Sequence, residues 1–247
     1  MEVIIYSEDR RDSEKELESL KTVLKKIFLI INNRTRTDLP ELKPLNSGKR
    51  INGSLWKAKK SKNLDVRRQR NLLITTIASE LKLKKYIAFH VDGDDVWSKN
   101  NRAEINTHKA IFIADVKQVI SSYLSSLTAL QVDEIVSNFF YIVPFYSIES
   151  WAYANKDRLK EEILERKIST AEDKEIIETP IQDLDEIAQI KDKTSIRDFK
   201  NFELFNDHRL PWDELYNVQK SFYSVVEEMK KNPNLIADLQ KTADQPH

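Results

Sequence analysis

Three short apolar segments of the chain have the pattern of buried strands. Residues 2–7, 86–91 and 139–143 are rich in β-branched and aromatic side chains, and polar residues or proline follow each of them at once. Between them, apolar residues recur three and four positions apart, which predicts helices over about 13–31 and 64–83. Strands that alternate with helices in this way predict an α/β domain with a largely parallel sheet.

The remainder of the chain reads mainly as helical. Periodic apolar positions predict helices over about 110–130 and from Ser147 towards Arg166, whereas residues 32–64, with two Pro and two Gly, are expected to be irregular or short-stranded. Residues 168–195 are acidic and weakly periodic, so we expect a loop or an insertion there. The tail, about 211–239, is predicted to be helical and to pack back on the sheet through its apolar face.

These patterns divide the chain into two parts. Residues 1–165 form the expected α/β domain, and residues 166–247 form an acidic linker followed by a helical C-terminal extension that packs on it. Apolar residues make up 40% of the composition, which is enough to bury a sizeable core.

Glycine is scarce enough to exclude several function classes. The 247 residues include three Gly, namely Gly48, Gly53 and Gly93. A GxGxxG dinucleotide turn, a GxxxxGK[ST] phosphate loop and a GxSxG nucleophile elbow are therefore all absent from the sequence. If the protein handles phosphates, we expect it to use metals or cationic side chains.

The absence of cysteine and of long apolar runs limits the cellular compartments in which we expect this protein. With no Cys, disulfides, thiolate zinc sites and Cys nucleophiles are excluded. No apolar run approaches the ~18 residues of a membrane span, and the first residues lack the basic start of a signal peptide. We therefore expect a cytoplasmic protein without a membrane partner.

Charge is balanced overall but unevenly distributed. The chain has 40 basic and 40 acidic residues, yet residues 34–85 contain fifteen Lys and Arg against four Asp and Glu. Residues 157–186 show the reverse, with five basic against eleven acidic residues. The basic stretch, with Trp56 in it, is typical of a surface that binds nucleic acid, and a solvated basic face is the alternative. The candidate phosphate-binding residues are Lys49, Arg50, Lys57, Lys59, Lys60, Lys62, Arg67, Arg68 and Arg70.

Acidic residues follow the predicted strands at the point where each strand ends. Glu8 follows the first strand, Asp92, Asp94 and Asp95 follow the middle one, and Glu149 comes shortly after the last. The carboxyl ends of parallel strands meet at one edge of a sheet, where α/β proteins bind ligands.

Such a group of carboxylates favours a hard cation. Carboxylates raise each other's pKa unless a cation neutralises them, and oxygen ligands select Mg²⁺, Mn²⁺ or Ca²⁺. Two such ions can activate a water and stabilise the leaving oxygen in phosphodiester cleavage. The alternative is structural: Asp-Gly-Asp-Asp is also a common turn, and Glu8 and Glu149 also suit the first turn of a helix. We interpret His90 as a structural histidine and expect Trp151 to pack beneath the site.

The segment at 142–155 carries a family resemblance. Its sequence, IVPFYSIESWAYAN, resembles the "IP…IEaWllaD" segment of small stand-alone TOPRIM-like proteins related to the OLD nucleases. An acid after the first strand and a DxD after a later one are similar to the same pattern, over about residues 2–160. Asp9 and Arg10 follow Glu8, where that family usually has Gly.

The resemblance implies a TOPRIM-like, mostly parallel sheet flanked by helices, with the helical C-terminal extension added. It also implies a Mg²⁺- or Mn²⁺-dependent nuclease, the effector of an anti-phage defence system, that acts on nucleic acid (DNA ahead of RNA) beside an ABC-type ATPase partner. The implied catalytic metal ligands are Glu8, Asp92, Asp94 and Glu149, with Asp95 as an additional ligand. Lys156 and Lys200 are candidates for the basic residue that OLD-like enzymes place near the metals.

Two other function classes stay open. Arg70-Asn71 and the segment 86–97 are similar to the "RN…eYIaFLDsDDvW" segment of GT-A glycosyltransferases, in which the DxD holds a metal on a sugar nucleotide. That similarity accounts neither for the segment 148–155 nor for the basic stretch. A non-catalytic module that binds nucleic acid or an ATPase is the third interpretation.

Overall fold

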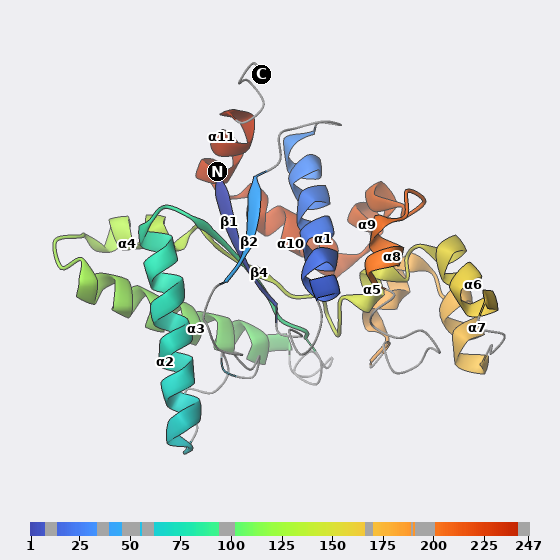
Figure 1. Ribbon diagram of the computed structural model, residues 1–247, viewed down its shortest axis with the longest axis horizontal. Helices are drawn as coiled ribbons and strands as arrows, with labels where there is room; N and C mark the ends of the chain where they lie inside the picture. The colour runs from blue at the N-terminus through green and yellow to red at the C-terminus, as the bar shows by residue number, and fades with distance from the viewer. Residues whose placement is uncertain are drawn as a thin grey trace.

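Four parallel strands form one sheet in the order β2-β1-β3-β4 (Figure 1). They are β1 (Glu2–Ser7), β2 (Glu41–Pro44), β3 (Tyr86–His90) and β4 (Phe139–Ile142). The α/β class with a parallel sheet is thereby confirmed. This computed structural model describes residues 1–7, 14–33, 40–45, 55, 62–93, 102–165, 170–188, 190 and 201–241. In the ranges 14–33 and 102–165, the side chains are described from residue 17 and from residue 106 onward.

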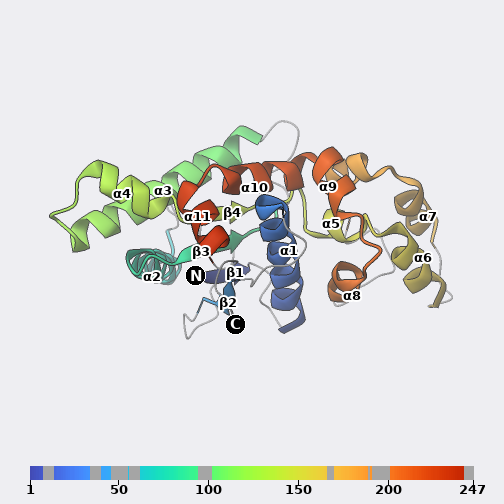
Figure 2. The ribbon, with the colours of Figure 1, turned by 90° about the horizontal axis from the view of Figure 1, so that it is seen from above.

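Helices connect and cover the strands. Figure 2 shows α2, α3 and α4 together at one end of the molecule and α5 to α9 at the other, with the sheet and α1 between them. The helices within residues 1–165 are α1 (Glu14–Asn32), α2 (Leu64–Lys82), α3 (Arg102–Tyr123), α4 (Ala129–Val136), α5 (Glu149–Ala152) and α6 (Lys156–Glu165). Those after it are α7 (Ala171–Glu178), the 3-10 helix η3 (Ile181–Glu186), α8 (Asn201–Asn206), α9 (Trp212–Val218), α10 (Lys220–Lys230) and α11 (Pro233–Lys241).

Both faces of the sheet are buried because the side chains of each strand alternate between two cores. In β1, Val3 and Ile5 face the core formed with α1 and the C-terminal helices. Ile4 and Tyr6 face the opposite core, formed with α2, α3 and α4. Every one of these four side chains is at most 4% exposed, which explains why the predicted strands read as continuous apolar runs.

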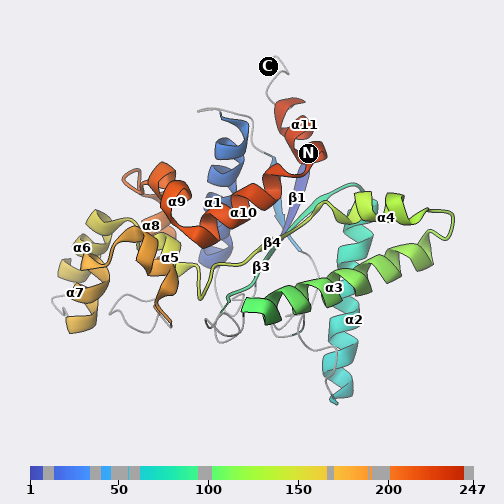
Figure 3. The same cartoon turned by 180° about the vertical axis from the view of Figure 1, so that it is seen from behind.

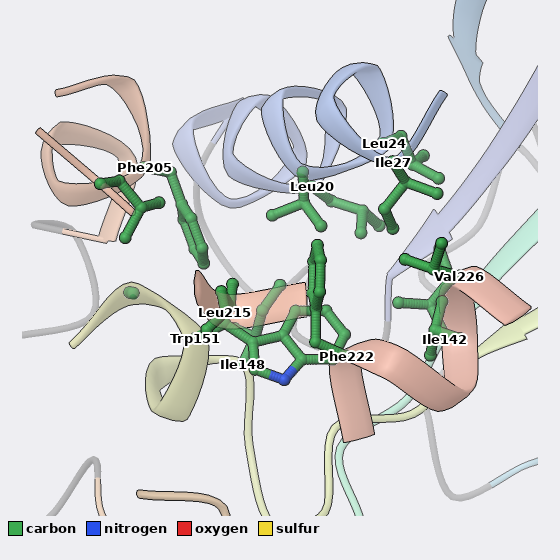
Figure 4. Packing of buried hydrophobic residues seen from close by; sticks show 14 of the residues in the cluster. Leu20, Leu24, Ile27, Ile142, Ile148, Trp151, Phe205, Leu215, Phe222 and Val226 are labelled. Carbon is green, nitrogen blue, oxygen red and sulfur yellow. The ribbon is translucent and has the colours of Figure 1, made fainter. Parts of the chain in front are cut away.

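The C-terminal helices belong to the first of these cores. Figure 3 shows α10 running across the molecule close to β4, and Figure 4 shows Trp151 and Phe222 facing Leu20 and Leu24 of α1. The ring of Phe222 meets that of Trp151 edge-on, at 5.1 Å between centroids. The helical extension therefore packs on the sheet, and its core is continuous with that of residues 1–165.

Three sequence expectations need correction. The stretch 110–130 is not one helix, because α3 ends at Tyr123 and α4 begins at Ala129. The helix expected from Ser147 towards Arg166 is two, α5 and α6. The expected loop at 168–195 contains α7 and η3, and its Ile176 and Leu184 are at most 1% exposed within the core. No helix in the described ranges is both long and apolar enough to cross a membrane.

Candidate functional site

The strand order creates a topological switch point at the carboxyl ends of β1 and β3. The connection after β1 leads to β2, on one side of β1, whereas the connection after β3 leads to β4, away from β1 on the other side. The connections after β1 and β3 therefore lead in opposite directions. Open parallel sheets bind ligands at such a switch point, outside the carboxyl ends of the strands. Among the described residues, Ser7, His90 and Asp92 lie at this point.

A chain of polar contacts joins these three residues. Ser7 and His90 are paired in the ladder between β1 and β3, and the Oγ atom of Ser7 lies 3.2 Å from Nδ1 of His90. The Nε2 atom of His90 lies 3.5 Å from Oδ1 of Asp92. All three side chains are at most 5% exposed. A neutral imidazole that accepts from the Ser7 hydroxyl at Nδ1 carries its proton on Nε2, the nitrogen that faces the Asp92 carboxylate.

Gly93 brings the loop after β4 against this chain. Val91 extends the pairing by donating its N–H to the carbonyl of Ile142, at 3.2 Å. A Cβ atom built on Gly93 would lie 1.8 Å from the carbonyl oxygen of Phe145 and 2.7 Å from that of Pro144. Glycine is therefore required here by close backbone approach, and the approach holds the segment that contains Asp92 beside the segment that leads to Glu149.

Glu149 begins the short helix α5 and is 4% exposed. Its Oε1 atom accepts a hydrogen bond from Nδ2 of Asn201, at 2.7 Å. Asn201 is the first residue of α8, so the C-terminal part of the chain holds this carboxylate. Two positions before Glu149, Ser147 is 1% exposed, and its hydroxyl has no hydrogen-bond partner within the part of the chain that the structure describes.

Trp151 belongs to α5 itself and points into the core. Its side chain is fully buried, and its indole N–H donates to Oγ of Ser221 at 2.7 Å. The Asp185 carboxylate accepts from the N–H and from the hydroxyl of Ser221, at 2.8 and 2.6 Å. Burial raises the pKa of Asp185 above its usual value. The hydrogen bonds from Ser221 and Ser150 act in the opposite direction but do not outweigh burial. The network fixes α5, and hence the position of Glu149, relative to α10.

The structure tests the predicted ligand set only in part. Glu8, Asp94 and Asp95 lie outside the described residues, whereas Asp92, the second residue after β3, and Glu149, the first residue of the helix after β4, lie inside them. Within the described ranges, no three His, Asp or Glu side chains lie close enough together to hold a metal ion. A cation site at this edge thus requires ligands from the segments that follow β1 or β3, in addition to Asp92 or Glu149.

The predicted basic surface separates into three groups. Lys62, Arg67 and Arg68 are exposed at and before the start of α2. Arg70 is only 4% exposed, because its guanidinium pairs with Asp115 at 2.8 Å and lies over the ring of Phe112. Its assignment as a phosphate-binding residue is therefore corrected: its charge is already neutralised. The other candidates, Lys49, Arg50, Lys57, Lys59 and Lys60, lie outside the described residues.

Lys156 has a structural partner. Its ammonium donates to the main-chain carbonyl of Ile176, at 2.6 Å, and so ties α6 to α7. Burial, together with the nearby Lys160, lowers the pKa of Lys156 to about 8. Lys200, the other candidate for a basic residue near the metals, lies outside the described residues.

Sequence reasoning missed one residue of this site, Asn201. The buried contact of His90 with Ser7 is consistent with the interpretation of His90 as a structural histidine. Asn201 carries no sequence signal, because its role depends on how α8 packs on α5. The chain matches none of the protein-family models, none of the curated proteins and none of the solved structures with which it was compared.

Proposed function

We propose that this protein is a metal-dependent nuclease whose site lies at the carboxyl ends of β1, β3 and β4. The observation that carries the proposal is the position of two buried carboxylates: Asp92 directly after β3 at the switch point, and Glu149 at the start of the helix after β4. The contact of Gly93 with the loop after β4 supports their convergence on one site. The resemblance of residues 142–155 to TOPRIM-like proteins points to the same chemistry.

The donor chemistry fits a hard divalent cation. Asp92 and Glu149 would hold Mg²⁺ or Mn²⁺ together with Glu8, Asp94 and Asp95, and all of these are oxygen donors. Such a cation supplies an activated water and stabilises the charge on the leaving oxygen. In this proposal His90 orients the Asp92 carboxylate and Asn201 orients that of Glu149, as the groups behind metal ligands commonly do.

The biological role follows from the resemblance. As the effector of an anti-phage defence system, the protein would cleave nucleic acid in the cytoplasm under the control of an ABC-type ATPase partner. The exposed Arg67 and Arg68 near the start of α2 support a polyanionic substrate.

The test compares substrates with and without metal. Plasmid DNA, single-stranded DNA and RNA are incubated with Mg²⁺, with Mn²⁺ or with EDTA, and the products are resolved by electrophoresis. Asp92→Asn and Glu149→Gln keep the size of each side chain, and we expect each to reduce cleavage at least a hundredfold. Glu134→Gln, an exposed change on α4, is the matched control and should cleave like the wild type.

Each of the other possible results of this experiment would assign the protein to a different functional class. Release of UDP or GDP from sugar nucleotides, without nuclease activity, would make the protein a glycosyltransferase. Salt-sensitive binding of nucleic acid without any turnover would make it a non-catalytic module. Cleavage that persists in Asp92→Asn would show that the carboxyl edge of the sheet takes no part in the reaction.

A further inference from the structure

A groove between α2 and α3 has a lining that includes neither Asp92 nor Glu149. Its volume is about 470 Å³, and it is open to solvent. One stripe of its lining comes from α2, with Arg67, Asn71 and Thr75 four residues apart. The facing stripe comes from α3 and includes Gln118 and Ser122.

The lining of the groove is rich in hydrogen-bonding groups and carries no net negative charge. Asp115 is the one acid among its described lining residues, and Arg70 pairs with it at 2.8 Å. Arg67, one turn before Arg70, leaves a second guanidinium exposed to solvent. Arginine, amide and hydroxyl side chains are the groups that contact phosphates and sugars in nucleic-acid complexes.

An aromatic side chain follows the groove along α3, outside its lining. Tyr123 follows Ser122 at the end of α3 and is 54% exposed, with the ammonium of Lys82 lying 5.0 Å from the centre of its ring. An exposed ring beside a cation is the arrangement on which the bases of a single strand stack. From Arg67 to Lys82, α2 extends ~22 Å, a length of several nucleotides.

We propose that the α2–α3 groove holds the sugar–phosphate backbone of a single strand of nucleic acid. Arg67 binds a phosphate, Asn71 and Gln118 hydrogen-bond to the backbone, and Tyr123 stacks on a base. The exposed ring of Tyr123 favours a single strand, because the bases of a single strand are free to stack on an aromatic side chain. Because α3 belongs to the connection from the carboxyl end of β3 to the start of the parallel strand β4, a strand that follows α3 back along this connection is led towards the proposed site.

The inference rests on the proposed function, so its test measures binding separately from cleavage. A fluorescein-labelled 15-nucleotide single-stranded DNA is titrated with the full chain in EDTA, and anisotropy is followed between 50 and 200 mM KCl. We expect Arg67→Glu to raise Kd at least tenfold and Tyr123→Ala to raise it about fivefold or more. Arg67→Ala should lower the salt slope by about 0.7, the contribution of one phosphate contact on a single strand.

Lys25→Glu is the matched control, because Lys25 is exposed on α1, which covers the opposite face of the sheet. It should bind within twofold of the wild type. The inference fails if Arg67→Glu also binds within twofold, if Lys25→Glu weakens binding as much as Arg67→Glu, or if a duplex of the same sequence binds more tightly than the single strand.

A second readout separates this failure from that of the proposed function. The wild-type protein is incubated with Mn²⁺ and bis(p-nitrophenyl) phosphate, a small diester that does not need the groove. Hydrolysis of the diester, with DNA binding that does not depend on Arg67, would overturn the groove and leave the nuclease standing. Binding that depends on Arg67, without hydrolysis of either substrate, would support the groove and overturn the nuclease.

Discussion

The Oγ atom of Ser7 lies 3.2 Å from Nδ1 of His90, although the two residues are 83 positions apart. The parallel ladder between β1 and β3 sets them opposite each other at the last position of each strand. His90 then reaches Asp92 with its other ring nitrogen. The end of the first strand is thereby coupled to the carboxylate that follows the third, and the switch point of the sheet becomes a polar, buried unit.

Replacing His90 tests whether this unit orients Asp92. We expect His90→Ala to weaken Mn²⁺ binding at least tenfold, because removing a group that supports a metal ligand typically costs 10–100-fold in affinity. His90→Gln keeps a donor within reach of Asp92 and should recover part of that loss, whereas His90→Asn, which is shorter and reaches towards Ser7, should not. The measurement is a Mn²⁺ titration followed by electron paramagnetic resonance. Equal affinities for the three variants would contradict the role of His90.

Gly93 offers a test of the backbone contact beneath the site. Gly93→Ala places a methyl group where the carbonyl oxygen of Phe145 lies, at 1.8 Å, and neither backbone can move without displacing the sheet edge. We expect the free energy of unfolding to fall by about 3 kcal/mol or more, and Tm by roughly 6–12 °C. Differential scanning calorimetry measures both changes. Ala114→Ser, which adds one atom at an exposed position of α3, should change stability by less than about 0.5 kcal/mol.

The strands follow directly from local sequence. A buried parallel strand has neighbours on both faces, so β1, β3 and β4 read as apolar runs. The site at the carboxyl ends of these strands stays a prediction. The helix breaks did not follow from periodicity. Between α5 and α6, the carboxamide of Asn155 accepts the N–H of Arg158 and starts a new helix, and the apolar spacing is the same on both sides of that break.

Two of the wrong predictions concern features for which the sequence does contain a local signal. Thr170 and Asp173 form a capping box that starts α7, although the stretch around them is too acidic to show a helical period. Arg70 lies on the buried stripe of α2, three and four residues before Leu73 and Ile74, so periodicity separates it from the exposed Arg67. The contact of Asn201 with Glu149 spans 52 positions and exists only because α8 packs on α5, so no local pattern predicts it.

The Asn201 contact should make the C-terminal part of the chain necessary for the site. Asn201→Ala leaves a buried oxygen of Glu149 without the donor at 2.7 Å, and an unsatisfied buried acceptor costs about 1–3 kcal/mol. We expect that loss in urea unfolding, together with reduced nuclease activity. In a double-mutant cycle with Glu149→Gln, the two changes should be non-additive by at least about 0.5 kcal/mol. Asn217→Ala, at an exposed position of α9, serves as the control, and additive energies would show that the contact does not position Glu149.

Arg209 predicts how stability responds to acid. Its guanidinium binds both carboxylate oxygens of Glu161 on α6, at 2.5 and 2.8 Å, and also the carboxylate of Asp207. These hydrogen bonds lower the pKa of Glu161 from 4.5 to about 2 and hold that of Asp207 well below its usual range. For acids whose pKa is depressed by folding, the stabilisation is present above the unfolded pKa and is lost as the pH falls through the folded one.

The wild type should therefore lose stability as the pH falls from 4.5 towards 2, and Arg209→Gln should lose less over the same range because its carboxylates are no longer held ionised. Urea midpoints measured at pH 7, 4.5 and 2.5 test this, and the gap between wild type and variant should narrow with each step. Arg68→Gln removes an ion pair of 3.6 Å between two side chains that are about 80% exposed, and its gap to the wild type should be near zero at every pH because solvent screens such a pair. A gap for Arg209→Gln that stays constant with pH would show that the ion pairs of α6 do not contribute to folding.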